Sequence, residues 1–139
     1  MSRRRSSALT DGELRIMRAL WDLERATVTE IIDRMGRRES AVPAYNSVLT
    51  MLGILERKGY VTHRKDGRAF LFEPAVDRRA ARKNALANVL SKFFDGSRSL
   101  LILDLVGQEA LEPDEVARVR QLLDQAGKDS PKAARGRRR

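Results

Sequence analysis

The sequence predicts a mainly α-helical fold with a small β-hairpin, arranged as a winged helix-turn-helix domain followed by a C-terminal helical region. Three observations predict it. Residues 10–58 contain three segments whose apolar residues recur at helical spacing. Residues 60–72 form two strand-like runs around the pair Asp66-Gly67, which is a strong hairpin signal. Residues 78–123 return to helical spacing.

The first helix is expected at residues 11–23. Thr10 and Glu13 have the Thr-x-x-Glu spacing of a capping box. One apolar stripe follows at helical spacing, made of Leu14, Met17, Leu20 and Trp21.

A short link and a second helix come next. Thr27 and Val28 are expected to pair as a minimal strand, and Thr29 is expected to cap a helix at residues 30–37. The buried side of this helix is predicted to hold Ile31, Ile32 and Met35.

The third helix is expected to begin near Pro43, a residue suited to a first turn, and to end before Gly59. Its apolar side holds Tyr45, Val48, Leu52 and Leu55, with Met51 beside them. Its opposite side is small and polar, with Asn46, Thr50, Gly53 and Arg57. Gly53 has two interpretations: simple tolerance, or close approach of the helix to another surface.

A hairpin with a basic tip follows directly. Its strands are expected at residues 60–63 and 69–72, joined through HRKDGRAF. A solvated turn would explain these cations, and so would a hairpin that contacts a polyanion. Its position directly after a helix with a polar face favours a wing over a plain turn.

The C-terminal half is expected to need a partner. Helices are predicted at residues 78–94, across 99–106 and from Pro113, and the segment SLLILDLV is apolar nearly all round. About 50 residues bury too little surface to form a core alone. A second copy would supply one through an isologous interface, and packing back on the first domain is the alternative. Expected interface residues are Leu90, Phe93, Phe94, Leu100, Leu101, Leu103, Val119 and Leu122.

These patterns divide the chain into four expected parts. Residues 1–8 form a basic disordered tail, 9–76 the winged domain, 77–126 the dimerisation region and 127–139 a second basic disordered tail. The formal net charge is +9, and most of it lies in the two tails. Basic tails bind polyanions without requiring a particular fold.

Composition argues against several classes of function. The chain has no cysteine and one histidine, which argues against thiol catalysis, Cys-ligated zinc and His-centred sites. It shows no membrane-length apolar run, no secretory signal, no Gly-rich phosphate loop and no nucleophile elbow. We therefore expect no enzyme, no cofactor, no metal and no membrane insertion.

The polar side of the third helix is typical of a helix that reads DNA in the major groove. Predicted contacts of this helix are Ala44, Tyr45, Asn46, Ser47, Thr50, Ile54 and Arg57. The wing residues Arg64, Lys65 and Arg68 are expected to contact phosphates, which position a protein without specifying sequence. The competing interpretation is a nonspecific, nucleoid-type DNA-binding protein driven by the tails.

The segment PAYNSVLTMLGILERKGYVTHRKDGRAFLFEP, with LTDGELRIMRALW before it and FFDGSRSLLILDLV after it, resembles the penicillinase-repressor family of BlaI/MecI-type transcriptional repressors. The resemblance extends from about Leu9 to Leu123. It implies a cytoplasmic homodimeric repressor on a dyad-symmetric operator of double-stranded DNA. It also implies a membrane sensor metalloprotease that relieves repression, with cleavage of the repressor. The family's Asn-Phe cleavage pair corresponds here to Asp104-Leu105. The cysteine cluster of related copper-responsive repressors has no counterpart in this chain.

Overall fold

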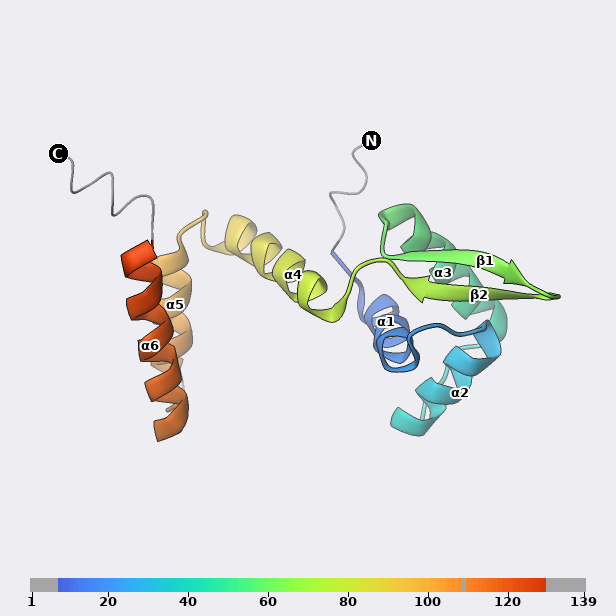
Figure 1. The fold of residues 1–139 in the computed structure, drawn as a ribbon, viewed down its shortest axis with the longest axis horizontal. Helices are drawn as coiled ribbons and strands as arrows, with labels where there is room; N and C mark the ends of the chain where they lie inside the picture. Colours follow the sequence, from blue (N-terminus) through green and yellow to red (C-terminus); the bar gives the residue numbers. More distant parts are fainter. Residues whose placement is uncertain (1–7, 109, 130–139) are drawn as a thin grey trace. The chain divides into compact units, whose positions relative to one another are not determined.

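The computed structural model describes residues 8–108 and 110–129. The chain divides into two compact units, the first ending at Phe93 and the second beginning at Phe94. The first unit contains α1 (Asp11–Leu23), α2 (Val28–Arg38), α3 (Tyr45–Lys58), β1 (Val61–Asp66), β2 (Ala69–Pro74) and α4 (Arg78–Phe93) (Figure 1). The second contains α5 (Arg98–Gln108) and α6 (Pro113–Asp129). The predicted fold class, a winged helix-turn-helix with further helices, is confirmed.

Two capping boxes begin the first two helices. Thr10 accepts a hydrogen bond from the backbone N–H of Glu13, and the Glu13 carboxylate accepts one from the backbone of Thr10. Thr27 and Glu30 repeat the arrangement at α2. Thr29 was predicted as this cap, and that prediction is wrong because Thr27 has the extended backbone that a capping residue needs.

The minimal strand predicted at Thr27 and Val28 is also displaced. Ala26 forms the bridge instead, exchanging two backbone hydrogen bonds with Phe72 of β2. This bridge ties the link between α1 and α2 to the hairpin.

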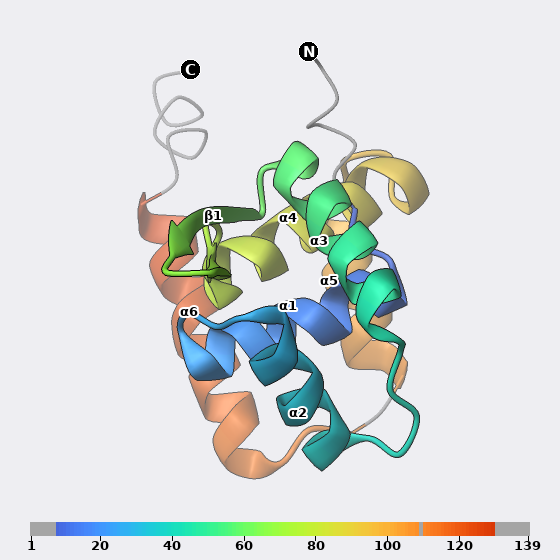
Figure 2. The same ribbon diagram turned by 90° about the vertical axis from the view of Figure 1, so that its right-hand side faces the viewer.

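One core holds the first unit together. Helices α1, α2 and α3 contact one another, and the two strands contact them in turn (Figure 2). The core residues with no exposed surface are Ile16, Met17, Leu20, Ala26, Ile31, Val48, Leu52 and Leu55. Burying one such side chain contributes roughly 1.5–3 kcal/mol, so this core stabilises the position of α3.

Helix α3 begins two residues later than predicted. Ala44 is its N-cap, so Pro43 lies before the helix rather than in its first turn. Gly59 ends the helix in the left-handed conformation at φ 89°, as its place after Lys58 predicts.

The hairpin turn is shifted by one residue from the prediction. Asp66 pairs with Ala69, so the loop consists of Gly67 and Arg68 rather than Asp66 and Gly67. Gly67 has a φ of 67°, which matches a type II′ turn with glycine first. The strands are therefore longer than predicted and carry Arg64 and Lys65 within β1. Figure 1 shows the hairpin extending beyond the helices to a free tip.

Helices α5 and α6 leave much apolar surface exposed. Burial was predicted for the segment around α5, yet Leu103 is 68% and Leu105 60% exposed in the single chain. Helix α6 reaches Asp129, past the expected start of the second tail at 127. The rest of both expected tails, apart from Ala8, lies outside the described residues.

Candidate nucleic-acid interface

The outer face of α3 is exposed along most of its length. Val48, Leu52 and Leu55 point into the core, so the opposite side of the helix faces outward. Among the predicted contact residues, Ile54 is half-buried, and the exposed ones are Ala44, Tyr45, Asn46, Ser47, Thr50 and Arg57. Tyr45 was expected on the buried side, but it is 52% exposed because it lies in the first turn, beyond the edge of the core.

Leu49 adds an apolar group that the sequence analysis missed. It is exposed and lies three residues after Asn46 in the helix, on the same side. Stepping the helix from Asn46 would have found it. Apolar side chains among polar ones suit contacts with thymine methyl groups as well as hydrogen bonds to base edges.

The start of α3 differs from the starts of α1 and α2. Its N-cap, Ala44, makes no side-chain cap, and its first turn carries no acidic residue. The first backbone N–H groups of a helix lack partners within it and carry partial positive charge. An uncapped N-terminus without carboxylates therefore suits an incoming phosphate.

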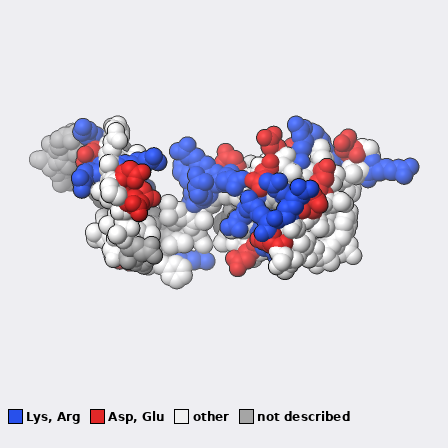
Figure 3. Space-filling view, turned by 90° about the horizontal axis from the view of Figure 1, so that it is seen from below, with Lys and Arg blue, Asp and Glu red and all other residues white. Residues whose placement is uncertain are grey.

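The wing carries its three predicted cations at and near the tip. Arg68 lies in the turn and is exposed. The Lys65 ammonium lies 6.0 Å from the centre of the Phe70 ring. Arg64 is 3.6 Å from the carboxylate of Glu73, which offsets part of its charge. Lys65 and Arg68 are thus the less compensated pair, and the projection at the right-hand end of Figure 3 is basic.

His63 links the wing to α3, a connection that the sequence analysis did not find. Its Nδ1 lies 2.7 Å from a carboxylate oxygen of Glu56 in α3. Its ring lies 5.3 Å from Phe70 and 5.4 Å from Phe72, measured between ring centres. His63 is therefore a mid-strand residue that fixes the wing against the helix, rather than a residue at a strand end.

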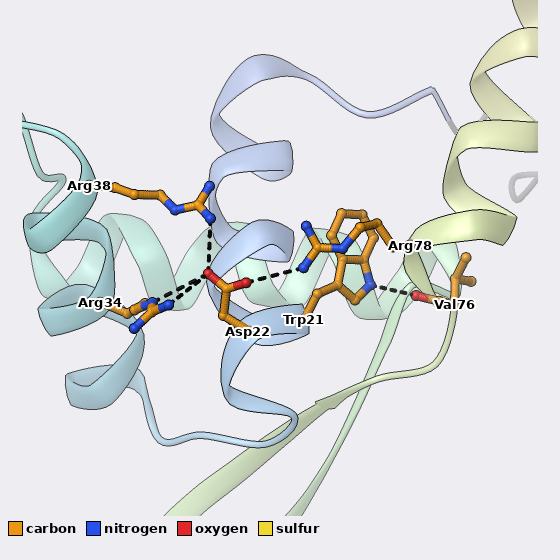
Figure 4. Close-up of polar contacts among 6 residues, drawn as sticks. All are labelled: Trp21, Asp22, Arg34, Arg38, Val76 and Arg78. Atoms are coloured by element: carbon orange, nitrogen blue, oxygen red, sulfur yellow. Dashed lines mark hydrogen bonds and ion pairs between the residues drawn. The ribbon is translucent and has the colours of Figure 1, made fainter. Parts of the chain in front are cut away.

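A cluster of arginines surrounds Asp22 at the end of α1 (Figure 4). One carboxylate oxygen accepts from Arg34 at 3.1 Å and Arg38 at 3.0 Å, and the other accepts from Arg78 at 3.1 Å. Three cations share one anion, so the cluster keeps a net positive charge. Burial raises the pKa of Asp22, but the hydrogen bonds from Arg34 and Arg78 outweigh it and leave the pKa lowered.

A second ion pair joins α3 to α1. Lys58 Nζ lies 2.8 Å from the Glu13 carboxylate and 3.0 Å from the Ala8 carbonyl oxygen. Burial acts to raise the pKa of Glu13, but the bonds from Lys58 and Thr10 lower it overall. The C-terminal end of α3 is thus held against α1 by Lys58 and against the wing by Glu56, which helps to fix the orientation of its outer face.

The residues predicted for dimerisation are distributed over three helices. Leu90 and Phe93 lie on α4, Phe94 follows it, and the others lie on α5 and α6. Phe93, Leu100, Leu103 and Leu122 are exposed, and Leu90, Phe94, Leu101 and Val119 are half-buried. Asp104 and Leu105 are exposed within α5.

The described ranges contain neither a metal-binding cluster nor a membrane-spanning helix. Residues 8–108 and 110–129 contain no cluster of His, Cys, Asp or Glu suited to a metal ion. No helix in this part of the chain is long and apolar enough to cross a bilayer.

Comparison with known proteins gives a consistent result. The family model described as penicillinase repressor matches residues 9–125. The penicillinase repressor of Bacillus licheniformis is 25% identical over 117 residues, covering 84% of this chain and 90% of that protein. The methicillin resistance regulatory protein MecI of Staphylococcus aureus (strain N315) is 23% identical over 116 residues, covering 84% and 93%.

A solved structure supports the fold alone. The complex structure of hsRosR-S4 has a TM-score of 0.51 at 15% identity, with 92% of this chain and 97% of that chain covered. At this identity the likeness concerns architecture and carries no function.

Proposed function

Because the chain belongs to the penicillinase repressor family, we propose that it is a DNA-binding transcriptional repressor. The observation that carries the proposal is the outer face of α3, which is exposed, small and polar and starts without a side-chain cap. Beside it stands a hairpin whose tip carries Lys65 and Arg68. A polar helix face next to a basic projection has the chemistry that base edges and phosphates require.

In this proposal the two elements have different tasks. Helix α3 enters the major groove, where Asn46 and Thr50 contact base edges and Leu49 contacts apolar groups. Lys65 and Arg68 contact phosphates and set the register of the protein on the duplex. The bond between His63 and Glu56 holds the wing at a fixed angle to α3.

We propose that the protein acts as a homodimer on a dyad-symmetric operator. Exposed large apolar residues support this, on α4 in the first unit and on α5 and α6 in the second, since exposed apolar surface on a small protein often marks an interface. An isologous pair would present two copies of α3, and the spacing of operator half-sites would follow from their separation.

We further propose that a membrane sensor metalloprotease relieves repression by cutting between Asp104 and Leu105. Leu105 is 60% exposed, but the bond lies inside a helix, so α5 must open locally before a protease can bind it. Mass spectrometry of the protein from induced cells should detect a fragment ending at Asp104. An intact chain under full induction would contradict this route.

A competition assay tests sequence-specific repression. A promoter fragment with the operator should compete at least about 10³-fold better than scrambled DNA at physiological salt. Equal competition would overturn the proposal in favour of nonspecific binding.

Removing residues 1–7 and 130–139 then separates the tails from the fold, because α6 extends to Asp129. If α3 and the wing recognise the operator, the truncated protein keeps its preference. The salt dependence of its affinity should become shallower, by about one unit of slope for each lost phosphate contact. A complete loss of binding would favour the nucleoid-type alternative.

A further inference from the structure

A cavity of about 450 Å³ lies between α1 and α4 in the first unit. Three parts of the first unit line it: α1 with the residues just before it, Tyr60 after the end of α3, and α4. This volume falls within the range of roughly 300–1,000 Å³ that is usual for small-molecule sites. The cavity is separate from the outer face of α3 and from the wing tip.

The interior of the cavity is mainly apolar. Leu9, Leu14 and Trp21 line it from the side of α1, and Ala81 and Ala85 line it from the side of α4. Small alanines on α4 leave the space open where larger side chains would have filled it. An apolar body such as an alkyl chain or a ring therefore suits the interior.

The rim of the cavity is cationic. Arg18 of α1 and Arg78 and Arg82 of α4 all line it. Arg78 is bonded to Asp22 and lies over the Trp21 ring, with its guanidinium carbon 5.2 Å from the ring centre (Figure 4). Arg18 and Arg82 are exposed and, within the described residues, have neither an ion pair nor a hydrogen bond.

We propose that this cavity binds a small amphipathic organic anion, with its apolar part against Trp21 and its anionic head between Arg18 and Arg82. Charge complementarity selects this occupant. The apolar face of a second copy would leave two guanidiniums without counter-charges, and an uncharged ligand would make no use of them. Arginine is also the side chain best suited to a carboxylate, which it can bind through two parallel hydrogen bonds.

The cavity lies beside residues that connect α1, α3 and α4. Trp21 donates a hydrogen bond from Nε1 to the Val76 carbonyl oxygen at 2.9 Å. The backbone N–H of Tyr60 donates to the Leu55 carbonyl oxygen, and the Tyr60 carbonyl oxygen accepts from the backbone N–H of Ala75. A ligand in the cavity would therefore contact Trp21 and Tyr60, which are themselves bonded to the end of α3 and to the link before α4. The proposal concerns binding itself and does not depend on DNA recognition.

Binding in the cavity can be followed by intrinsic fluorescence, because Trp21 is the single tryptophan of the chain. We would titrate the full-length protein with decanoate and with decanol, which has the same chain length without charge, both below the concentrations at which they aggregate. Decanoate should change the Trp21 fluorescence saturably and bind roughly tenfold or more tightly than decanol, because its head accepts charge-assisted hydrogen bonds. No saturable change, or equal affinities, would overturn the proposal.

Two pairs of matched variants locate the binding site. Arg18→Gln combined with Arg82→Gln should remove the preference for decanoate over decanol. Arg79→Gln combined with Lys83→Gln removes the same amount of charge, from α4 outside the cavity, and should leave the preference intact.

Ala85→Phe should fill the cavity and abolish binding of both probes. Ala87→Phe lies on the same helix outside the cavity lining and should not. A preference that survives the first double substitution, or binding that survives Ala85→Phe, would place the anion elsewhere.

Discussion

The two units of the chain use their apolar residues in opposite ways. In the first unit, α1, α2, α3 and both strands close around a core whose central side chains have no exposed surface. In the second, neither α5 nor α6 has a buried residue among those described, and Leu103 is 68% exposed. The first unit therefore has a closed core that can support folding by itself. The second unit exposes the apolar surface that the proposed dimer would bury.

This contrast predicts that a leucine in each unit will respond differently to truncation. Leu52→Ala removes a fully buried side chain and should lower the free energy of unfolding by about 2–5 kcal/mol, at any protein concentration. Leu103→Ala should have an effect that vanishes as the protein is diluted below its dimerisation constant. Chemical denaturation at several protein concentrations measures both, and a concentration-independent loss in the second variant would contradict the comparison.

A charge at the same position should break the proposed interface directly. Leu103→Asp places a carboxylate in apolar surface, and the dimerisation free energy should fall by at least about 2 kcal/mol, the scale of an interface hot spot. Sedimentation should then give the mass of one chain, while the melting of the first unit stays unchanged. A variant that remains dimeric with full operator affinity would show that the interface lies elsewhere.

Within the first unit, α3 and the wing should differ in the kind of effect as well as its size. Asn46→Ala should cost about 1–3 kcal/mol of discrimination at one base position of the operator. Lys65→Ala should weaken binding to every sequence by a similar factor and reduce the salt slope by about one. Binding to a panel of single-base operator variants separates the two. A change of base preference in the wing variant would reverse the assignment.

The ion pair that holds α3 to α1 should make the first unit sensitive to acid. The pKa of Glu13 is lowered from its ordinary value of 4.5 in the folded protein, so its contribution to stability is present above that value. The contribution is lost as the pH falls below 4.5 and through the lowered pKa. Glu13→Gln should be less stable at neutral pH and should lose less further stability in this acid window.

Urea denaturation across the acid range measures the effect. Asp124→Asn removes an exposed carboxylate from α6 and should follow the unmodified protein at every pH. If Glu13→Gln retained the full acid slope, the Lys58 pair would not be its source.

Local patterns predicted the elements well, whereas contacts between distant segments escaped prediction. The helices and the hairpin follow from apolar periodicity and turn chemistry, and the capping box at Thr27 and Glu30 was also readable from its spacing. The cluster around Asp22 could not be predicted from spacing, because Arg34 and Arg78 reach Asp22 from separate helices. The link between His63 and Glu56 likewise depends on the register of β1, which the turn sets and which a one-residue shift would change.

A substitution at Gly53 tests whether α3 merely tolerates glycine there or needs it to approach DNA closely. A Cβ at this position would meet only the Arg57 Nη1 atom, at an ordinary 3.9 Å, so nothing described within the protein requires glycine there. Gly53→Ala should therefore raise the free energy of unfolding by about 0.5–1 kcal/mol through helix propensity alone. Gly59→Ala is the matched control and should destabilise, because its φ of 89° disfavours a side chain. If α3 approaches DNA closely, the first variant should bind the operator more weakly although it is more stable. Unchanged affinity would show that the helix tolerates glycine at a position that DNA does not approach.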